Sequence, residues 1–271
     1  MSEEQNKDVL ISVQAELTKI VQKGTNEKTV AKAELQIINK SAAAMRRAPM
    51  DLLAQLIRDY AKRERDISEE DVRILIDMVK SFFRKHLLAS GYQEKKIKAL
   101  ITKFRDAGRR SAPWKPTSTR VPGRPQDGAD GNRQSRWLLP PDHKFYASEV
   151  DATLVEIKYF LQTLAMQGAP VLPPNFIQES FHWLLGHSVE PGQYLDPIQL
   201  IPIEFQEFIN EPRLIQSGHL TPLDRGGRHV PDNTFLMLAR SNQIQGNQTL
   251  EELLELMERV VSGYQQRRQK E

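Results

Sequence analysis

One stretch of 33 residues, 214–246, constrains the fold of this chain more than any other. Its apolar run 214–220 predicts a short strand, and Pro222 ends that strand. A second apolar run, 235–238, predicts another strand. The stretch is therefore expected to fold as strand, loop, strand and short helix.

The loop and the helix of this stretch carry local signals of their own. Asp224-Arg225-Gly226-Gly227 is typical of a turn, because paired glycines tolerate positive φ and Asp bonds its own backbone. We expect Ser241 to cap the short helix.

Four polar residues recur along the stretch at wide, ordered spacings: His219, His229, Asn233 and Asn242. A His on one strand and an Asn on the following helix can converge in space. Such a pair suits a general base and a divalent metal ion.

With these features the stretch resembles the HNH, or ββα-metal, nuclease motif. The matching residues are Gly218-His219, Pro222-Leu223, Gly226-Gly227, His229, Asn233, Leu236, Asn242 and Gly246. Fourteen positions separate His219 from Asn233 and nine separate Asn233 from Asn242, and both separations suit the family. The resemblance covers 33 of 271 residues.

The resemblance implies a role for each polar residue. His219 is the implied general base, and an ordinary histidine pKa near 6.5 lets it accept a proton at neutral pH. Asn242 is the implied ligand of Mg²⁺ or Mn²⁺, since an amide oxygen is a hard, neutral ligand. Asn233 is expected to pin the loop and orient His219. His229 either contacts the scissile phosphate or braces the loop.

The sequence departs from the family at Gly218, where many HNH proteins place an Asp that is a second metal ligand. Related ββα-metal nucleases also place Gly there and hold the metal with a single Asn, water and substrate phosphate. Mg²⁺ commonly keeps several waters, so one protein ligand suffices. We interpret Asp224 as a turn residue rather than a ligand. The family's zinc-binding cysteine pairs are absent, because the chain has no cysteine.

A plainer interpretation of the motif is a strand ending in a turn, with His219 a hydrogen-bonded core histidine. A lone His favours that interpretation, but the joint pattern favours a nuclease-type site. Arg225, Arg228 and Arg240 flank the motif. Surface arginines are usually only solvated, yet three around a phosphate-cleaving motif are expected to contact nucleic-acid phosphates.

Composition limits the class of protein. With 271 residues, 39% of them apolar, the chain has room for one large domain or two modest ones. The lack of cysteine excludes a disulfide framework and fits a cytoplasmic protein. The polar start MSEEQNKDVL predicts no signal peptide, and no apolar run reaches membrane-spanning length. The net charge is only +3, so a partner must be inferred from where the charge lies.

The first region, 1–106, is expected to be helical and to serve DNA recognition or dimerisation. Helical apolar spacing covers 28–46, 50–63, 68–90 and 93–106. Ser68 is expected to cap the third of these helices and Gly91 to end it. Their faces carry basic pairs that are either solvated or in contact with a phosphate backbone.

The second region, 107–142, is rich in Pro, Gly and Arg and lacks periodicity. Nine basic and three acidic residues between Lys103 and Arg136 give +6, more than the whole chain carries. It is either a flexible tether or a basic arm that orders along DNA, and we favour the arm. The arginines expected to contact DNA here are Arg109, Arg110, Arg120 and Arg124.

The third region, 143–271, is expected to be the nuclease domain. Amphipathic helices are predicted over 149–166 and 175–185, and His182 and His187 are interpreted as structural. Thr249 with Glu252 predicts a capping box for a last helix, 250–264. The buried stripe expected on it is Leu253, Leu254, Met257, Val260 and Val261.

Taken together, the sequence predicts an α+β, predominantly α-helical protein with a C-terminal ββα-metal domain. The implied activity is Mg²⁺-dependent hydrolysis of double-stranded DNA, with a sequence-specific type II restriction endonuclease as first choice. A homodimer joined through the N-terminal region or the helix 250–264 is expected, because one site cuts one strand. The alternatives are an inactive DNA-binding or scaffold protein with a degenerate motif, and a homing, nicking, RNA-directed or RNA-guided nuclease.

Overall fold

The computed structural model describes residues 67–110, 134–173 and 181–269, all within the compact unit Ile57–Glu271. The expected helices 28–46 and 50–63, and the arm residues Arg120 and Arg124, lie outside the described residues. The described part is α+β and mostly helical, with one two-stranded sheet. Within it, no helix has the length and apolar character to cross a membrane.

Two predicted helices begin and end close to where the sequence signals place them. α4 (Glu69–Ala89) starts at a capping box in which Ser68 and Asp71 bond each other's backbone, and Gly91 follows its end at φ +87°. α5 (Glu94–Gly108) extends two residues beyond the predicted end. Each buries one apolar stripe, and Phe83 of α4 meets Phe104 of α5 edge-on.

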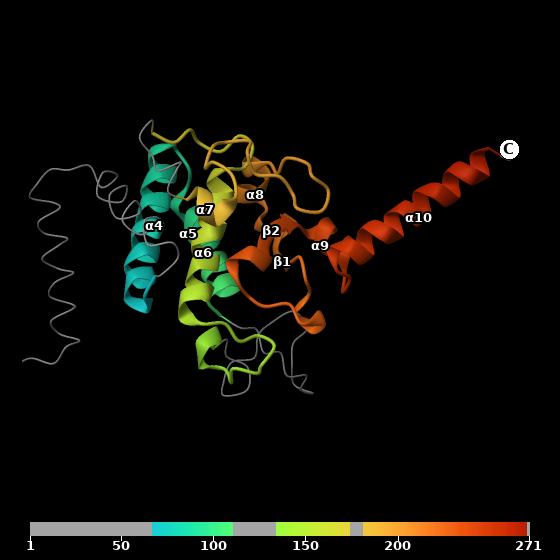
Figure 1. Ribbon diagram of the computed structural model, residues 1–271. Coiled ribbons are helices and arrows are strands. Elements are labelled where there is room, and N and C mark those ends of the chain that lie inside the picture. Colours follow the sequence, from blue (N-terminus) through green and yellow to red (C-terminus); the bar gives the residue numbers. More distant parts are fainter. Residues whose placement is uncertain (1–66, 111–133, 174–180, 270–271) are drawn as a thin grey trace, which may run out of the picture. The chain divides into compact units, whose positions relative to one another are not determined.

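The centre of the fold is α6 (Glu149–Leu164), against which α4 and α5 pack (Figure 1). The expectation of an amphipathic helix was wrong, because the residues 152–164 are buried on every face. α4 and α5 cover one side and β2 lies against another, so no side is left for solvent. Its buried polar side chains therefore need internal partners, and several of these side chains lie next to the candidate site. The helices α4 and α5 thus pack with the C-terminal elements, across the boundary expected at 106/107.

The sheet consists of β1 (Ile215–His219) and β2 (Thr234–Leu238), antiparallel, with His219 opposite Thr234 and Gly218 opposite Phe235. A two-stranded sheet leaves an edge whose backbone groups need partners. Side chains supply them on β2: Gln162 of α6 accepts from the Leu236 amide, and Asp196 accepts from the Leu238 amide. The Tyr194 hydroxyl donates to the Leu236 carbonyl.

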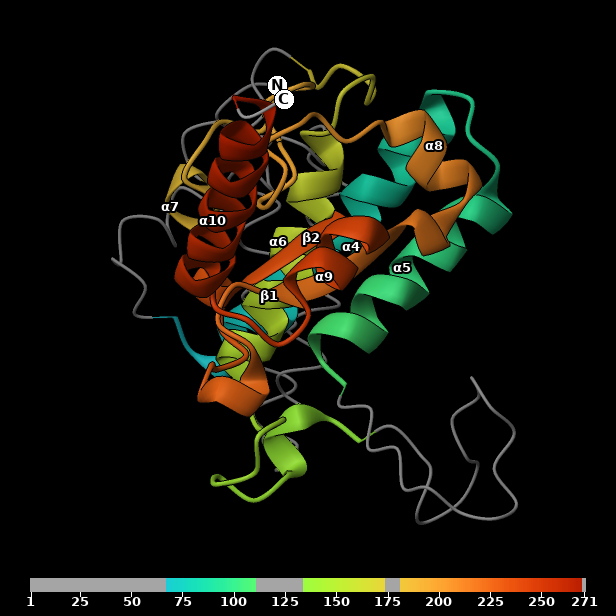
Figure 2. The same ribbon diagram turned by 90° about the vertical axis from the view of Figure 1, so that its right-hand side faces the viewer.

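After β2 the chain turns directly into α9 (Ala239–Gln245), which lies along the strand pair (Figure 2). The expectation that Ser241 caps this helix was wrong, because Leu238 occupies the N-cap position and offers no side-chain bond. Ser241 is instead a buried helical residue that donates to Asp196. Asp196 is itself buried, and its carboxylate also accepts from the amides of Ile198, Gln199 and Leu238, so four donors satisfy it.

Short elements connect this frame. They are η1 (Arg136–Leu138), α7 (His182–Leu185), α8 (Phe205–Asn210), η2 (Pro212–Leu214), η3 (Leu223–Arg225) and η4 (Pro231–Asn233). The predicted helix 175–185 is seen as α7, which ends at Gly186 with φ +77°, and 175–180 lie outside the described residues. The segment 107–142, expected to be a tether or a basic arm, is partly folded, since Gly108 belongs to α5 and the residues 136–138 form η1.

The last helix, α10 (Leu250–Arg268), starts at the predicted Thr249–Glu252 capping box and is longer than expected. The buried stripe predicted for it was wrong. Leu253 alone of the described residues of α10 is buried, and the other members of that stripe are exposed. Apolar spacing identified the helix correctly but gave no information on what covers it.

Candidate functional site

Asn233 braces the loop between the two strands. Its Oδ1 accepts from the Thr221 amide at 2.8 Å, and its Nδ2 donates to the carbonyls of Thr221 and Arg228, both at 2.9 Å. One side chain thus joins the two ends of the loop. This is the pinning expected of Asn233, although the bonds reach Thr221 and Arg228 rather than His219.

The two glycines of the loop are needed for different reasons, one for backbone conformation and one for lack of space. Gly226 has φ +83°, a left-handed conformation that an L side chain adopts only with strain. Gly227 has ordinary φ, but a Cβ there would lie 1.9 Å from the Thr221 carbonyl oxygen. Gly226 is thus required by its backbone conformation and Gly227 by the close approach of the loop to Thr221.

His219, the last residue of β1, faces His229 from that loop. Nε2 of His219 lies 3.0 Å from Nδ1 of His229, and Nε2 of His229 lies 2.8 Å from the carbonyl oxygen of Gly108. His229 is fully buried, whereas His219 is partly exposed. Of the two roles considered for His229, this burial supports bracing and is inconsistent with a direct phosphate contact in this conformation.

The hydrogen bonds of this chain fix where the protons are. A carbonyl only accepts, so Nε2 of His229 carries a proton and, in a neutral ring, its Nδ1 accepts. Nε2 of His219 must then be the donor between the rings. In neutral His219 the basic lone pair is therefore on Nδ1, on the side of the ring away from His229.

Both rings are held neutral. Burial, together with the charge of Arg136, lowers the pKa of His219 to about 4. Burial, with Arg136 and His219, lowers the pKa of His229 well below the ordinary value. A neutral pair at neutral pH is what the proton assignment requires, and it makes His219 able to accept a proton.

Gly108 and Arg136 support the histidine pair, and the sequence pattern gave no signal for either. The Gly108 carbonyl accepts from both His229 and Arg136 Nε, the latter at 3.0 Å. Arg136 also donates to the carbonyls of Ala107 and Phe145, so a buried cation closes the carbonyl end of α5. A Cβ on Gly108 would lie 2.9 Å from the Cα of Glu156, so α5 approaches α6 as only glycine permits.

Asn242 projects from α9 toward β1. Its Nδ2 donates to Oε1 of Gln216 at 2.7 Å, which leaves Oδ1 without a hydrogen bond from any described residue. One turn further along the helix, Gln245 donates to the carbonyls of His219 and Leu220. The helix is thus joined to the strand that carries His219, and Gln216 is a positioning partner that the sequence did not indicate.

His219 and Asn242 are not brought together by any hydrogen bond between described residues. Gln216 and His219 are three residues apart on β1, so their side chains leave opposite faces of the strand. Nor do the described residues include three His, Asp, Glu or Cys side chains placed to hold a metal ion. The donor set is therefore one amide oxygen, Asn242 Oδ1. This fits a hard ion that keeps its waters and takes a phosphate ligand, and does not fit a protein-built cage.

The arginines around the motif divide into those with an ion-pair partner among the described residues and those without one. Arg225 forms an ion pair with Glu252 at the start of α10. Arg228 in the loop and Arg240 on α9 are exposed, and neither forms an ion pair with a described residue. Arg110, two residues past the end of α5, lies 3.5 Å from Asp106 within that helix. Arg228 and Arg240 are therefore the arginines whose charge remains available beside the motif.

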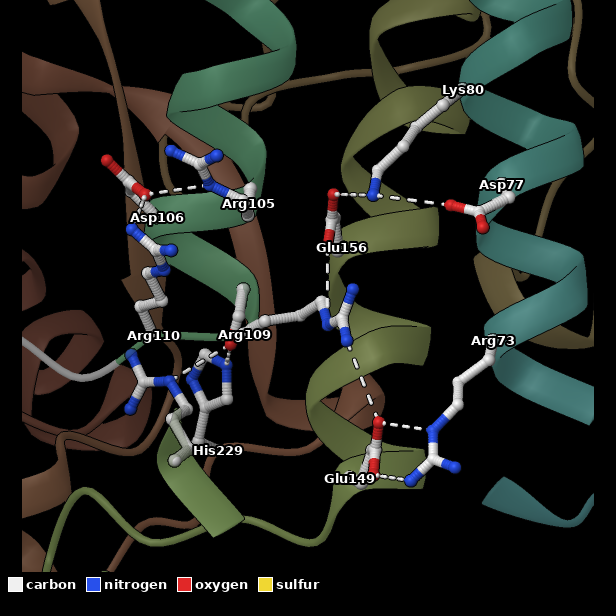
Figure 3. Close-up of polar contacts among 12 residues, drawn as sticks. Arg73, Asp77, Lys80, Arg105, Asp106, Arg109, Arg110, Glu149, Glu156 and His229 are labelled. Atoms are coloured by element: carbon white, nitrogen blue, oxygen red, sulfur yellow. Dashed lines mark hydrogen bonds and ion pairs between the residues drawn. The ribbon is translucent and has the colours of Figure 1, made fainter. Parts of the chain in front are cut away.

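Arg109, expected to contact DNA, lies instead in a network of charged side chains against α6 (Figure 3). It is 3.6 Å from Glu149 and 3.8 Å from the fully buried Glu156, and its guanidinium stacks on Trp137. Lys80 reaches Glu156 at 3.4 Å. Burial raises the pKa of Glu156, and these two cations oppose that shift. Its charge therefore balances buried carboxylates, and a DNA contact by Arg109 stays a prediction.

Asp224 and Lys158 complete the surroundings. Asp224 pairs with Lys144 at 2.7 Å and lies in η3, as expected of a turn residue. Lys158 of α6 donates to the Pro231 carbonyl at 2.6 Å and lies 3.6 Å from the centre of the Phe235 ring. Burial lowers the pKa of Lys158 to about 7. This lysine braces η4, the element that ends at Asn233.

Comparison with models of known families and with curated proteins finds no match. Among solved structures, the chain is similar to one described as the crystal structure of a type II restriction endonuclease, with 22% sequence identity and a TM-score of 0.37. The match covers 45% of this chain and 55% of the other, so it spans about half of that structure. A likeness of this size carries no argument about function.

Proposed function

We propose that this chain is a metal-dependent DNA endonuclease of the HNH, or ββα-metal, type. The observation that carries the proposal is the chain of hydrogen bonds from Gly108 through His229 to His219. It leaves a neutral His219 with its basic lone pair on Nδ1 at the end of β1. The strand–loop–strand–helix frame also carries an amide, Asn242, on its helix, and this amide is the proposed metal ligand.

In this proposal, His219 is the general base. Its Nδ1 accepts a proton from the water that attacks the phosphodiester. His229 fixes the ring by accepting the hydrogen bond from Nε2 of His219. Asn242 would hold Mg²⁺ or Mn²⁺ through Oδ1, and Gln216 keeps the amide turned that way. When bound, the ion supplies positive charge at the phosphate oxygens and at the leaving oxygen.

Arg228 and Arg240 are proposed to contact the phosphate backbone beside the scissile bond, since both are exposed and neither is paired with a described residue. Arg120 and Arg124 remain proposed contacts of the basic arm. The finer assignment is a sequence-specific type II restriction endonuclease. In it, 1–106 contributes recognition or dimerisation, 107–142 the arm and 143–271 the nuclease domain. A homodimer provides one site for each strand.

The test is cleavage of plasmid DNA by the full chain with Mg²⁺, with Mn²⁺ and with a chelator. We expect cleavage only with metal, and a loss of roughly 100-fold or more in His219→Ala. The matched control is His182→Ala, an exposed histidine on α7. Equal cleavage by wild type and His219→Ala would remove His219 from the mechanism. A parallel digest of RNA distinguishes a ribonuclease.

One observation favours a second function, a DNA-binding protein with an inactive motif. Gly218 stands where many HNH proteins have a ligand, and the described residues form no multi-ligand metal cluster. A Cβ at Gly218 would lie 2.4 Å from the Met237 methyl group, so the position is also packed. DNA binding without cleavage under every metal condition would establish this alternative.

A further inference from the structure

The last helix carries an apolar face that no described residue covers. Only Leu253 of α10 is buried, and it anchors the first turn. The exposed apolar residues are Leu254, Leu256, Met257, Val260, Val261 and Tyr264, with Tyr264 63% exposed. Helices in proteins gain most of their stability from packing an apolar face, so 19 residues with one buried side chain imply a missing partner.

Four of the six exposed apolar side chains, those of Leu254, Met257, Val261 and Tyr264, lie on one seam, and Leu256 and Val260 lie beside it. Positions 250, 254, 257, 261, 264 and 268 follow one another at intervals of four, three, four, three and four residues. This alternation is the spacing by which one helix packs along another. The seam ends in Arg268, and the helix is about 28 Å long at 1.5 Å per residue.

The order of these intervals is the same in both directions. Reversing the helix about Arg259 places Leu254 opposite Tyr264 and Met257 opposite Val261. A seam of this kind matches a second copy of itself running antiparallel, and the two-fold relation closes the pair.

Charge favours the same orientation. The half 250–258 holds four acidic and no basic residues: Glu251, Glu252, Glu255 and Glu258. The half 259–268 holds three basic and no acidic residues: Arg259, Arg267 and Arg268. Antiparallel pairing sets each acidic half against a basic half, whereas parallel pairing sets like charges side by side. The helix dipole accounts for the charges of the first and last turns but not for Glu255 and Glu258.

We propose that α10 is a dimerisation helix that pairs with α10 of a second copy of this chain, antiparallel, about a two-fold axis near Arg259. The apolar seam from Leu254 to Tyr264 forms the contact. The Arg225–Glu252 ion pair joins the start of α10 to the loop after β1. The inference concerns assembly alone and holds whether or not the chain cleaves DNA.

The first experiment measures the mass of the full chain by light scattering, without DNA. We expect a dimer for wild type and a monomer for Val261→Glu, because the substitution places a charge in the seam. The matched control, Gln266→Glu, adds the same charge on the opposite face of the helix and should remain a dimer. Circular dichroism checks that both variants stay folded, which the exposure of both positions favours.

The second experiment tests orientation, and the absence of native cysteine makes it direct. In the antiparallel pair, Leu254→Cys faces Tyr264→Cys of the other copy. The double variant should therefore form a disulfide-linked dimer on oxidation, and neither single variant should. Ten residues of helix place the two positions about 15 Å apart within one chain, too far for an internal bridge.

Three results would overturn the proposal. A wild type that is monomeric at all concentrations would mean that another segment of the same chain covers the seam. A dimer unaffected by Val261→Glu would place the interface elsewhere. Efficient cross-linking of the single variants would mean that the helices run parallel.

Discussion

Nε2 of His219 and Nδ1 of His229 lie 3.0 Å apart, and a single proton serves the contact between them. Because His229 also donates to the carbonyl of Gly108, that proton belongs to His219. The arrangement is directional: a backbone carbonyl at the end of α5 sets the tautomer of one ring, which sets that of the next. The position of the basic nitrogen in His219 thus depends on a residue 111 positions earlier in the chain.

Removing His229 should therefore impair cleavage although His229 contacts no substrate. We expect His229→Ala to lose about 10- to 100-fold in kcat, the usual cost of losing a partner that fixes a histidine tautomer. His229→Gln keeps one donor for Gly108 and one acceptor for His219, so it should recover part of the loss.

The measurement that separates positioning from simple folding is the pKa of His219, followed by NMR titration in both variants. Opening the buried pair to water should raise that pKa from about 4 toward the ordinary value in His229→Ala, and less in His229→Gln. Identical titration of His219 in wild type and His229→Ala would contradict the coupling.

The lowered pKa of His219 also predicts the acid limit of the reaction. Cleavage should be nearly independent of pH from neutrality down through 6.5, and its kcat/KM should fall only as pH approaches about 4. An acid limb near 6.5 in kcat/KM would mean that the acting base is solvated, with an ordinary histidine pKa.

Stability should follow the same shift with a definite sign. Below pH 6.5 the unfolded chain protonates His219, while the folded chain resists protonation until about pH 4. The unfolded state then binds more protons, so the free energy of unfolding should rise with pH between 4 and 6.5. Urea unfolding gives this free energy at each pH for wild type and for His219→Ala. The free energy of unfolding should rise less steeply with pH in the variant.

Local signals predicted much of the fold, because they depend on near neighbours along the chain. The capping boxes at Ser68 and Thr249, the turn at Gly226 and the two strands were all found at or near their predicted positions. What failed depends on distant partners. The full burial of α6 follows from elements on several sides of it, and the exposure of α10 from the lack of a covering element among the described residues.

The candidate site divides in the same way. The spacing of His219, Asn233 and Asn242 is a property of one continuous motif, and the sequence displays it. Gly108 and Arg136 reach that motif from a region without periodicity, so no local pattern marks them. The ion pairs of Arg109 were not predicted, because the charge of a basic stretch does not show which of its members faces buried carboxylates.

Asn242 gives a prediction about metal dependence. Asn242→Ala removes the amide oxygen and should abolish or strongly weaken cleavage, whereas Asn242→Asp keeps an oxygen ligand and should retain part of it. Gln216→Ala should raise the Mg²⁺ concentration needed for half-maximal cleavage, because Asn242 then loses the acceptor that orients it. Equal Mg²⁺ dependence in wild type and Asn242→Ala would place the ion elsewhere.

Arg109 gives a prediction about stability. Arg109→Ala leaves Glu149 and Glu156 with fewer cations, and we expect a loss of about 2 kcal/mol in the free energy of unfolding. That figure is below the usual cost of breaking a buried pair, because Lys80 still reaches Glu156. Glu156→Gln combined with Arg109→Met should recover part of the loss, since the pair is then removed rather than broken. Chemical unfolding of the three proteins is the measurement.

The two groups of arginines should differ in how their loss affects DNA binding. Arg228→Ala and Arg240→Ala each remove an exposed charge beside the motif. Each should reduce the slope of log affinity against log salt concentration by about 0.9 in magnitude. Arg109→Ala is the matched control, because its charge is balanced by Glu149 and Glu156 and should leave the slope unchanged. Fluorescence anisotropy with a DNA duplex between about 50 and 200 mM salt resolves slope changes of this size. If Arg109→Ala changes the slope as much as the other two variants, Arg109 contacts DNA as well as the buried carboxylates. The folded end of the arm would then be part of the DNA-binding surface.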